Sequence, residues 1–352
     1  MDFNFNEDDL NFRDTVSRFL MTEAAPEVLR DIWNTGPGRS PVMYSKIASQ
    51  GITALSVPED AGGLGMDDLT WSLMSQELGY YAIPDSVCDA AYVAASLIAS
   101  LPDSVTSRDD WLAQIAEGAI RVAIGHPVNL HVADADPADW LLLAHDDEIH
   151  CVAREAIEVS AKSSIDNSRR LADVRWIPTE DTCVAKGELA ERLWAEALNR
   201  GTLSISGQLL GLAQRILDLS IDYAAQRKQF GKPIGSFQAI KHHLADVATQ
   251  IEFARPVLYR AAYALTQGES NITMLASHAK LAAGQAAWLA ARHGIQVHGA
   301  MGYTWEVDLQ MFMKRVWVLD ASWGDRGFHK SRVADMLFSQ DAQIGPGCTF
   351  ED

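Results

Sequence analysis

The feature that most constrains the fold is a set of apolar stripes at helical spacing in the second half of the chain. One stripe runs from Leu209 to Tyr223 and another from Ile240 to Leu265, mostly in steps of three and four residues. Such spacing places apolar side chains along one side of a long helix. An alanine-rich segment at 271–295 and a segment at 307–339, whose stripe ends at Trp323, extend the pattern. The sequence therefore predicts four long helices with short connections, which is typical of an antiparallel four-helix bundle.

The first part of the chain is also predicted to be helical, whereas the middle is not. Asn6 can cap a helix whose first turn is acidic, as the helix dipole favours, and further helices are expected near 41–50, 68–80, 85–101 and 107–117. Short β-like runs broken by turn residues follow between 119 and 186. We therefore expect a mainly α protein with a small β domain. Its parts are an N-terminal helical domain at 1–118, a reduced middle β domain at 119–186, and a C-terminal four-helix bundle with a tail at 187–352.

Composition and charge exclude several classes of protein. The net charge of −18 repels nucleic acid and anionic lipid, so neither is an expected partner. The acidic N-terminus lacks the positive region of a signal peptide, and no apolar run is long enough to cross a bilayer. The four cysteines are scattered without metal-ligand spacing, so a reduced, cytoplasmic protein with no metal site is expected.

A polar and aromatic corner separates the first two bundle helices. Arg227 is predicted at the end of one helix, Gly231 and Pro233 break the chain, and the next helix begins near Ser236. A cation at a helix C-terminus is favoured by the helix dipole alone. The residues of this corner nevertheless combine a guanidinium that can pair with phosphate, aromatic rings and side-chain amides. This combination suits an adenine dinucleotide. The residues are Arg227, Gln229, Phe230, Phe237 and Gln238.

A second candidate patch lies in QVHGAMGYT, residues 296–304, where Gly299 follows a helix. A glycine there allows the backbone to approach a ligand closely. A plain glycine C-cap explains the same residue, so this motif alone is a weak signal.

The two patches together resemble the acyl-CoA dehydrogenase family. RKQFGKPIGSFQAIKHHLAD, followed about fifty residues later by QVHGAMGYTWEVDLQMFMKR, is similar to that family's C-terminal domain. SKIASQGITALSVPEDAGGLGMDDLTWSLMSQELGYYA is similar to its helical first domain. The resemblance implies an acyl-CoA substrate, electron-transfer flavoprotein or a similar acceptor, and tetramers in which FAD lies at a subunit interface. By the same resemblance, Arg227 pairs with the FAD pyrophosphate of a neighbouring subunit. The adenosine end would be lined by Gln229, Phe230, Phe237 and Gln238, and closed by Gln296 and Gly299.

By the same resemblance, the reaction needs a carboxylate base that takes a proton from the carbon beside the thioester carbonyl. That base is absent from both of the family's usual positions. Most members of the family place this Glu just before a Gly-Thr pair in the last bundle region, where this chain has Trp323. A minority place it on the helix that precedes the corner, where this chain has Gly201. Glu196 and Asp325 lie near these positions and are weak candidates. The family's flavin-contacting pattern T-E-P-x-x-G-S-D is also missing from the middle segment.

Three hypotheses follow from this departure. In the first, the chain resembles the degenerate subunit of bacterial α2β2 heterotetrameric acyl-CoA dehydrogenases of the steroid side-chain type, and it serves the FAD of a partner. In the second, it is an active homo-oligomer with a relocated base. In the third, it is a non-catalytic scaffold that binds no flavin.

Overall fold

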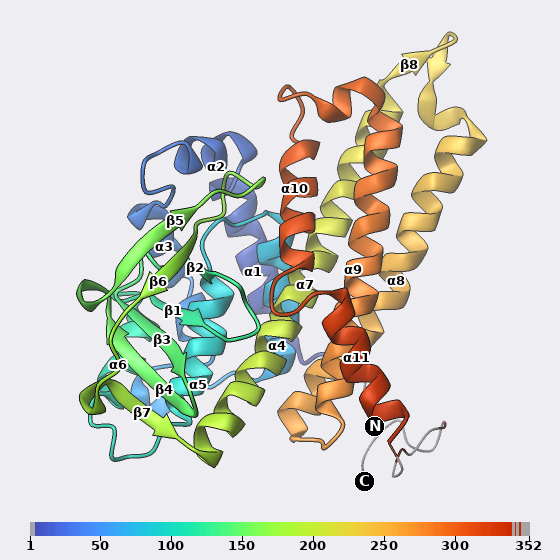
Figure 1. The fold of residues 1–352 in the computed structure, drawn as a ribbon. Helices are drawn as coiled ribbons and strands as arrows, with labels where there is room; N and C mark the ends of the chain where they lie inside the picture. Colours follow the sequence, from blue (N-terminus) through green and yellow to red (C-terminus); the bar gives the residue numbers. More distant parts are fainter. Residues whose placement is uncertain (1–3, 340–341, 343–344, 346–352) are drawn as a thin grey trace. The chain divides into compact units, whose positions relative to one another are not determined.

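The computed structural model describes residues 4–339, 342 and 345, so the predicted tail lies almost entirely outside the described residues. The chain divides into two compact units (Figure 1). The first contains residues up to Trp71 and Ile83–Gly201, and the second contains Ser72–Ala82 and the chain from Thr202 onward. None of the helices in the described ranges is long and apolar enough to cross a membrane.

The helices of the first unit include those predicted from the sequence, although the helix at Pro26–Trp33 was not anticipated. They are α1 (Glu7–Glu23), α2 (Pro26–Trp33), α3 (Pro41–Ser49), the first turn of α4 (Asp68–Tyr80), a π-helical segment (Asp89–Ala94) that continues into α5 (Ala95–Ala99), α6 (Arg108–Glu117), and the start of α7 (Glu188–Gln226). The predicted cap of α1 is confirmed, because the Asn6 side chain accepts a hydrogen bond of 2.7 Å from the Asp9 amide.

Two small sheets occupy the predicted β segment. A four-stranded sheet has the order β1 (Val122–Gly125), β3 (Trp140–His145), β4 (Glu148–Ala153) and β7 (Cys183–Lys186). A three-stranded sheet has the order β2 (Val132–Ala133), β6 (Leu171–Arg175) and β5 (Glu158–Lys162). The β1–β3 pair is parallel and the other pairs are antiparallel. The runs predicted from sequence correspond to β1, β3, β4, β5 and β6, whereas β2 and β7 were not anticipated.

Apolar side chains from both sheets form one shared core. Alternate residues of a strand point to opposite faces, so Leu141 and Leu143 of β3 lie on the same face as Val152 of β4. The core cluster comprises Ala123, Val132, Ala135, Ala138, Leu141, Leu143, Val152, Ile157 and Ala172.

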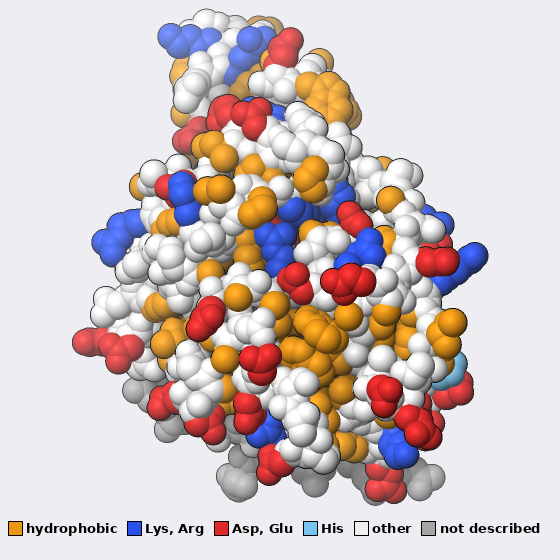
Figure 2. All heavy atoms as spheres, turned by 90° about the vertical axis from the view of Figure 1, so that its left-hand side faces the viewer, with side chains coloured by type: hydrophobic (Ala, Val, Ile, Leu, Met, Phe, Trp, Pro, Cys, Tyr) orange, Lys and Arg blue, Asp and Glu red, His pale blue; other side chains and the backbone are white. Residues whose placement is uncertain are grey.

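Charged side chains of both signs are interspersed on the face shown in Figure 2, with acidic ones beside the lysines and arginines near its middle.

The second unit is the helical bundle. It contains the rest of α4 and α7, the short hairpin of β8 (Lys228–Gln229) and β9 (Lys232–Pro233), α8 (Gln238–Gln267), α9 (Ile272–His298), a 3-10 turn (Gly299–Tyr303), α10 (Leu309–Asp320) and α11 (Arg326–Leu337). Helix α9 packs against α8, α10 and α11. Leu209, Leu212 and Ile216 of the first predicted stripe are fully buried, which confirms that the stripe faces the core.

The single helix predicted for 307–339 is wrong, because the chain breaks between α10 and α11. Trp323 and Gly324 have φ of +54° and +90°, in the left-handed region that a right-handed helix excludes. Asp325 then caps α11, since its carboxylate accepts a hydrogen bond of 2.8 Å from the Phe328 amide. The Trp323 side chain is still only 2% exposed, so the expected packing role is confirmed although its backbone is not helical.

Candidate functional site

The polar corner is an exposed hairpin that joins α7 to α8. Helix α7 ends with an Arg227 amide that donates to the Tyr223 carbonyl at 2.8 Å. The Arg227 carbonyl then accepts from the Ile234 amide at 2.8 Å, which closes the hairpin. The Arg227 side chain is exposed and has no hydrogen-bond or ion-pair partner among the described residues. Its guanidinium is therefore available to an external anion.

Of the two aromatic side chains of the corner, Phe230 is exposed and Phe237 is half-buried. Phe230 is 91% exposed and has a φ of +52°, a costly combination for an apolar residue without a ligand or partner. Its ring lies 6.1 Å from that of Phe237, centroid to centroid, at 87°. The Lys232 ammonium lies 4.6 Å from the Phe237 ring centroid. Gln229 and Gln238 are also exposed, so the corner offers both cations and aromatic faces to solvent.

The second patch lies at the same end of the bundle. Tyr223, one turn before Arg227, stacks on His298 with ring centroids 4.2 Å apart, and Gly299 follows His298 directly. Gly299 has φ +61° and ψ −138°. This conformation is open essentially to glycine alone and differs from a plain left-handed C-cap. No atom lies within 4 Å of the place where a Gly299 Cβ would be, and Gln296 is exposed one turn earlier. The two patches predicted separately from sequence are thus neighbours (Figure 1).

The turn that carries Trp323 is held by a buried cation. The Lys280 ammonium of α9 donates to the carbonyls of Ser322 at 2.6 Å, Leu319 at 3.2 Å and Gly324 at 3.3 Å. Lys280 lies sixteen residues before Gln296 on α9, which corresponds to about 24 Å of helix. The Trp323 turn therefore lies far from the corner along α9.

A buried histidine braces the same turn. One ring nitrogen of His329 lies 2.9 Å from the Trp323 carbonyl oxygen, and the other lies 3.1 Å from the Ser277 hydroxyl. Burial, and then the charge of Lys280, lower the pKa of His329 to about 4. Neither His329 nor Lys280 stood out in the sequence, because each lies within a helical pattern whose partners are distant in the chain.

The carboxylates near Trp323 have structural partners. Asp325 caps α11, as described above, and Asp320 accepts hydrogen bonds from Trp288 Nε1 at 2.6 Å and from Arg326 Nε at 2.9 Å. Both groups are therefore engaged in holding the α10–α11 turn.

Glu196 and Gly201 lie on the part of α7 that belongs to the first unit. One Glu196 carboxylate oxygen is 2.9 Å from Arg192 Nη1, and the other is 3.6 Å from Arg200 Nη1. Arg200 in turn lies 3.2 Å from Asp68 Oδ1. These ion pairs hold the Glu196 carboxylate against its own helix, and Gly201 is buried.

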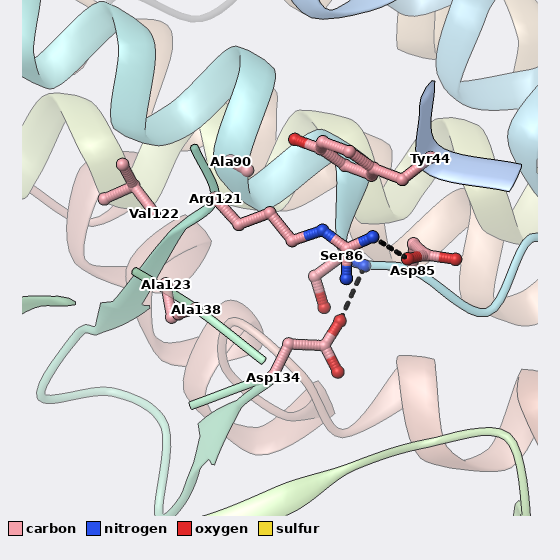
Figure 3. A pocket seen from close by; sticks show the side chains of 9 residues that line it. All are labelled: Tyr44, Asp85, Ser86, Ala90, Arg121, Val122, Ala123, Asp134 and Ala138. Atoms are coloured by element: carbon pink, nitrogen blue, oxygen red, sulfur yellow. Dashed lines mark hydrogen bonds and ion pairs between the residues drawn. The ribbon is translucent and has the colours of Figure 1, made fainter. Parts of the chain in front are cut away.

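Asp85 is the most unusual carboxyl group of the first unit (Figure 3). It lines a cavity of about 20 Å³, which is room for one water molecule. Both Asp85 oxygens lack a hydrogen bond among the described residues, and the nearest cation is Arg121 Nη2 at 3.5 Å. Burial raises the pKa of Asp85 to about 6, against the opposing charge of Arg39. The cavity is too small for a metabolite, so this perturbation bears on stability rather than on substrate binding.

Comparisons with known proteins agree with this arrangement. Residues 6–119 match the family described as acyl-CoA dehydrogenase, N-terminal domain, and residues 192–338 match acyl-CoA dehydrogenase, C-terminal domain. The acyl-CoA dehydrogenase IpdE2 of Mycobacterium tuberculosis is 31% identical over 306 residues, which cover 86% of this chain and 89% of that protein.

Solved structures share the fold. The ChsE4-ChsE5 complex from Mycobacterium tuberculosis has a TM-score of 0.85 at 21% identity, covering 97% of this chain and 100% of the matched chain. A Tcur3481-Tcur3483 steroid acyl-CoA dehydrogenase variant has a TM-score of 0.83 at 20% identity, covering 94% and 97%.

Proposed function

Because the chain belongs to the acyl-CoA dehydrogenase family, we propose that it is one subunit of an FAD-dependent oxidoreductase that introduces an α,β double bond into an acyl-CoA thioester. The observation that carries this proposal is the unpaired, exposed guanidinium of Arg227 beside the glycine-only conformation of Gly299. A structural corner has no need of both features together.

The residues present fit the pyrophosphate and adenosine end of FAD. The planar fork of Arg227 can pair with two phosphate oxygens, and the rings of Phe230 and Phe237 offer apolar faces to a base. The backbone at Gly299 can approach a ligand closely, because no side chain or neighbouring atom fills the space there. When bound, the flavin supplies the acceptor for the hydride that leaves the β-carbon of the substrate.

We infer that the base, which takes the α-proton, belongs to a partner subunit. Trp323 has no acidic group and is buried, and the carboxylates of Asp320 and Asp325 hold the turn around it. This chain would then complete an FAD site whose catalytic half lies on a second acyl-CoA dehydrogenase subunit, in an α2β2 assembly. Electron-transfer flavoprotein or a similar protein would reoxidise the flavin.

A bulky steroid acyl-CoA is the substrate class we propose. Similarity to a steroid acyl-CoA dehydrogenase and to a complex of two different named chains supports this choice. Loss of residues from one half-site also leaves space for a large acyl group.

Two alternatives are less well supported. A homo-oligomer with a relocated base would use Glu196 or Asp325, yet the first is held by two arginines and the second caps a helix. A scaffold that binds no flavin would not need a 91% exposed Phe230 in a left-handed conformation.

The assembly is tested by expressing the chain with and without a second acyl-CoA dehydrogenase chain from the same genome. We expect a yellow complex with one FAD for each pair of unlike chains, and a colourless or aggregated product when this chain is expressed alone. A stable yellow homotetramer with one FAD per chain would refute the heteromeric proposal.

The FAD half-site is tested with Arg227→Ala in that complex. Loss of a charge-assisted contact should weaken FAD binding by at least about tenfold, and Arg227→Lys should restore only part of the affinity. Lys330→Ala, which removes an exposed cation from α11, controls for the change in net charge. Unchanged FAD affinity in Arg227→Ala would show that Arg227 is only a helix-end cation.

A further inference from the structure

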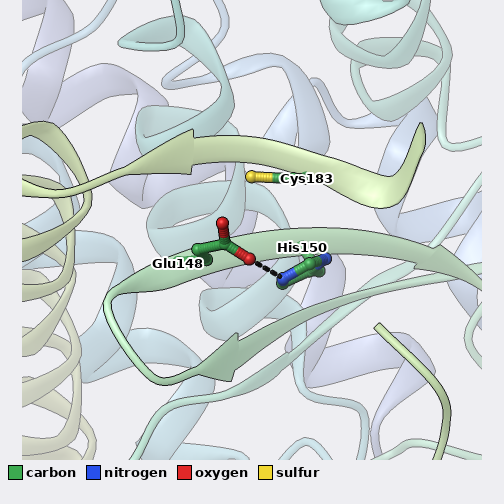
Figure 4. Close-up of side chains that lie close together, drawn as sticks. All are labelled: Glu148, His150 and Cys183. Carbon is green, nitrogen blue, oxygen red and sulfur yellow. Dashed lines mark hydrogen bonds and ion pairs between the residues drawn. The ribbon is translucent and has the colours of Figure 1, made fainter. Parts of the chain in front are cut away.

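We propose that Glu148, His150 and Cys183 form a binding site for a divalent transition-metal ion of the Zn²⁺ class. Each residue offers one ligand atom, and the three atoms lie within 4.8 Å of one another. Figure 4 shows the three side chains converging from two neighbouring strands. Carboxylate, imidazole and thiolate are together the ligand types that Zn²⁺ prefers.

The backbone explains why these side chains meet. Glu148 and His150 are two residues apart on β4, so they point to the same face of the sheet. Strand β7 pairs with β4, but the register shifts between Ile149 and His150, so that Cys183 rather than Val184 lies opposite His150. Such a shift re-aims a side chain, and here it places the thiol beside the imidazole and the carboxylate.

Hydrogen bonding around His150 is compatible with a role as a metal ligand. The Thr182 hydroxyl oxygen lies 2.9 Å from His150 Nδ1, so it can accept a hydrogen bond from an Nδ1–H group. In that tautomer Nε2 carries a lone pair that can bind a cation, and it lies 3.0 Å from a Glu148 carboxylate oxygen.

Cys183 distinguishes a metal site from a simple hydrogen-bonded pair of Glu148 and His150, because its sulfur offers a third ligand atom. A ligand histidine commonly donates its second ring N–H to an outer partner, which is the role Thr182 plays here. With bonds of about 2.0–2.3 Å, ligand atoms on one Zn²⁺ lie about 3–4 Å apart. The longest spacing of 4.8 Å therefore needs a contraction of about 1–2 Å on metal binding.

The site has an open side. His150 is 1% exposed, whereas the Glu148 side chain is 33% exposed. All three residues line a cleft of about 850 Å³ in the first unit. A water molecule entering from this cleft can supply the fourth ligand of a tetrahedral site. The sequence predicted no metal site, because the ligands become neighbours only through β7, a strand it did not predict.

Metal content of the full chain tests the proposal, and this test is independent of FAD. After metal removal, we expect one Zn²⁺ per chain to rebind and to raise the melting temperature. Co²⁺ should give a thiolate charge-transfer band. Cys183→Ala should lose that band and weaken Zn²⁺ binding by more than about tenfold, since loss of even an outer-shell partner costs about 10–100-fold. Cys151→Ala is the matched control, since Cys151 lies next to His150 on β4 but faces the other side of the sheet.

Two results would overturn the metal site. One is failure of the unaltered chain to bind Zn²⁺ more tightly than Cys183→Ala, and the other is an undiminished cobalt–thiolate band in that variant. Either result would show that Cys183 is not a ligand and that the three side chains do not form a metal site. Circular dichroism of each variant confirms that a lost signal does not come from unfolding.

Discussion

Replacing Asp85 by Asn should change the pH dependence of the stability of the first unit. Asp85 has a pKa of about 6 in the folded chain against 3.8 for an ordinary aspartate, because burial penalises its charged form. The folded state therefore binds the proton more tightly than the unfolded state does. By linkage, the free energy of unfolding is highest below pH 4 and falls as pH rises through 6. Asparagine has no such titration, so Asp85→Asn removes this loss.

The size of the effect follows from the shift. A difference of about two pKa units corresponds to about 3 kcal/mol over the whole titration. The chain has a pI near 4.9, so measurements are best made from pH 5 to pH 7.5, where about 1.4 kcal/mol of the change should fall. The variant should thus gain about that much, relative to the unaltered chain, between these two pH values.

Guanidinium unfolding followed by tryptophan fluorescence measures this difference. The control is Asp60→Asn, which changes an exposed carboxyl group of the same unit and should give a difference that does not vary with pH. If the stability profiles of Asp85→Asn and the unaltered chain run parallel from pH 5 to pH 7.5, burial does not perturb Asp85 and the reasoning fails.

Trp323→Ala should lower the free energy of unfolding by about 3–5 kcal/mol because it leaves a cavity. Trp305 is 63% exposed, so the control Trp305→Ala should lower it by less than about 1 kcal/mol. Thermal melting compares the two variants. Trp323→Phe should leave turnover of the reconstituted complex nearly unchanged, and a large loss would give Trp323 a role beyond packing. Glu196→Gln and Asp325→Asn should each keep turnover within a few-fold, whereas removal of a true base costs about a hundredfold or more. A collapse of turnover in either variant, at equal FAD content and melting temperature, would place the base on this chain.

Local patterns in the sequence predicted most of the fold. The helical stripes and the Asn6 cap depend on residues close in the chain, and both are confirmed. The break at Trp323 was missed because the apolar stripe continues through it. The break depends instead on Lys280, whose ammonium stabilises the carbonyls of the turn from another helix. A tertiary contact of this kind leaves no periodic signal.

The candidate sites likewise differ in whether their residues are close together in the sequence. The corner and the glycine patch could be found because glycine, arginine and aromatic residues stand together in short motifs, and the structure brings them to one end of the bundle. Glu148, His150 and Cys183 could not be grouped from sequence, since β7 is four residues long and its register shift depends on pairing with β4. The Glu-x-His spacing on a strand was the one signal available.

Helix α4 begins in the first unit, and its remainder, within Ser72–Ala82, belongs to the second. It fits closely there: a Cβ on Gly79 would lie 2.2 Å from the Gln208 carbonyl oxygen, and one on Gly211 would lie 2.0 Å from that of Gln76. During synthesis this piece leaves the ribosome about 120 residues before α7 is available to receive it, a wait on the order of ten seconds. The bundle core therefore cannot form from residues 202 onward alone, because it also needs this earlier segment of α4. A fragment cut at residue 202 would lack one of its packing surfaces.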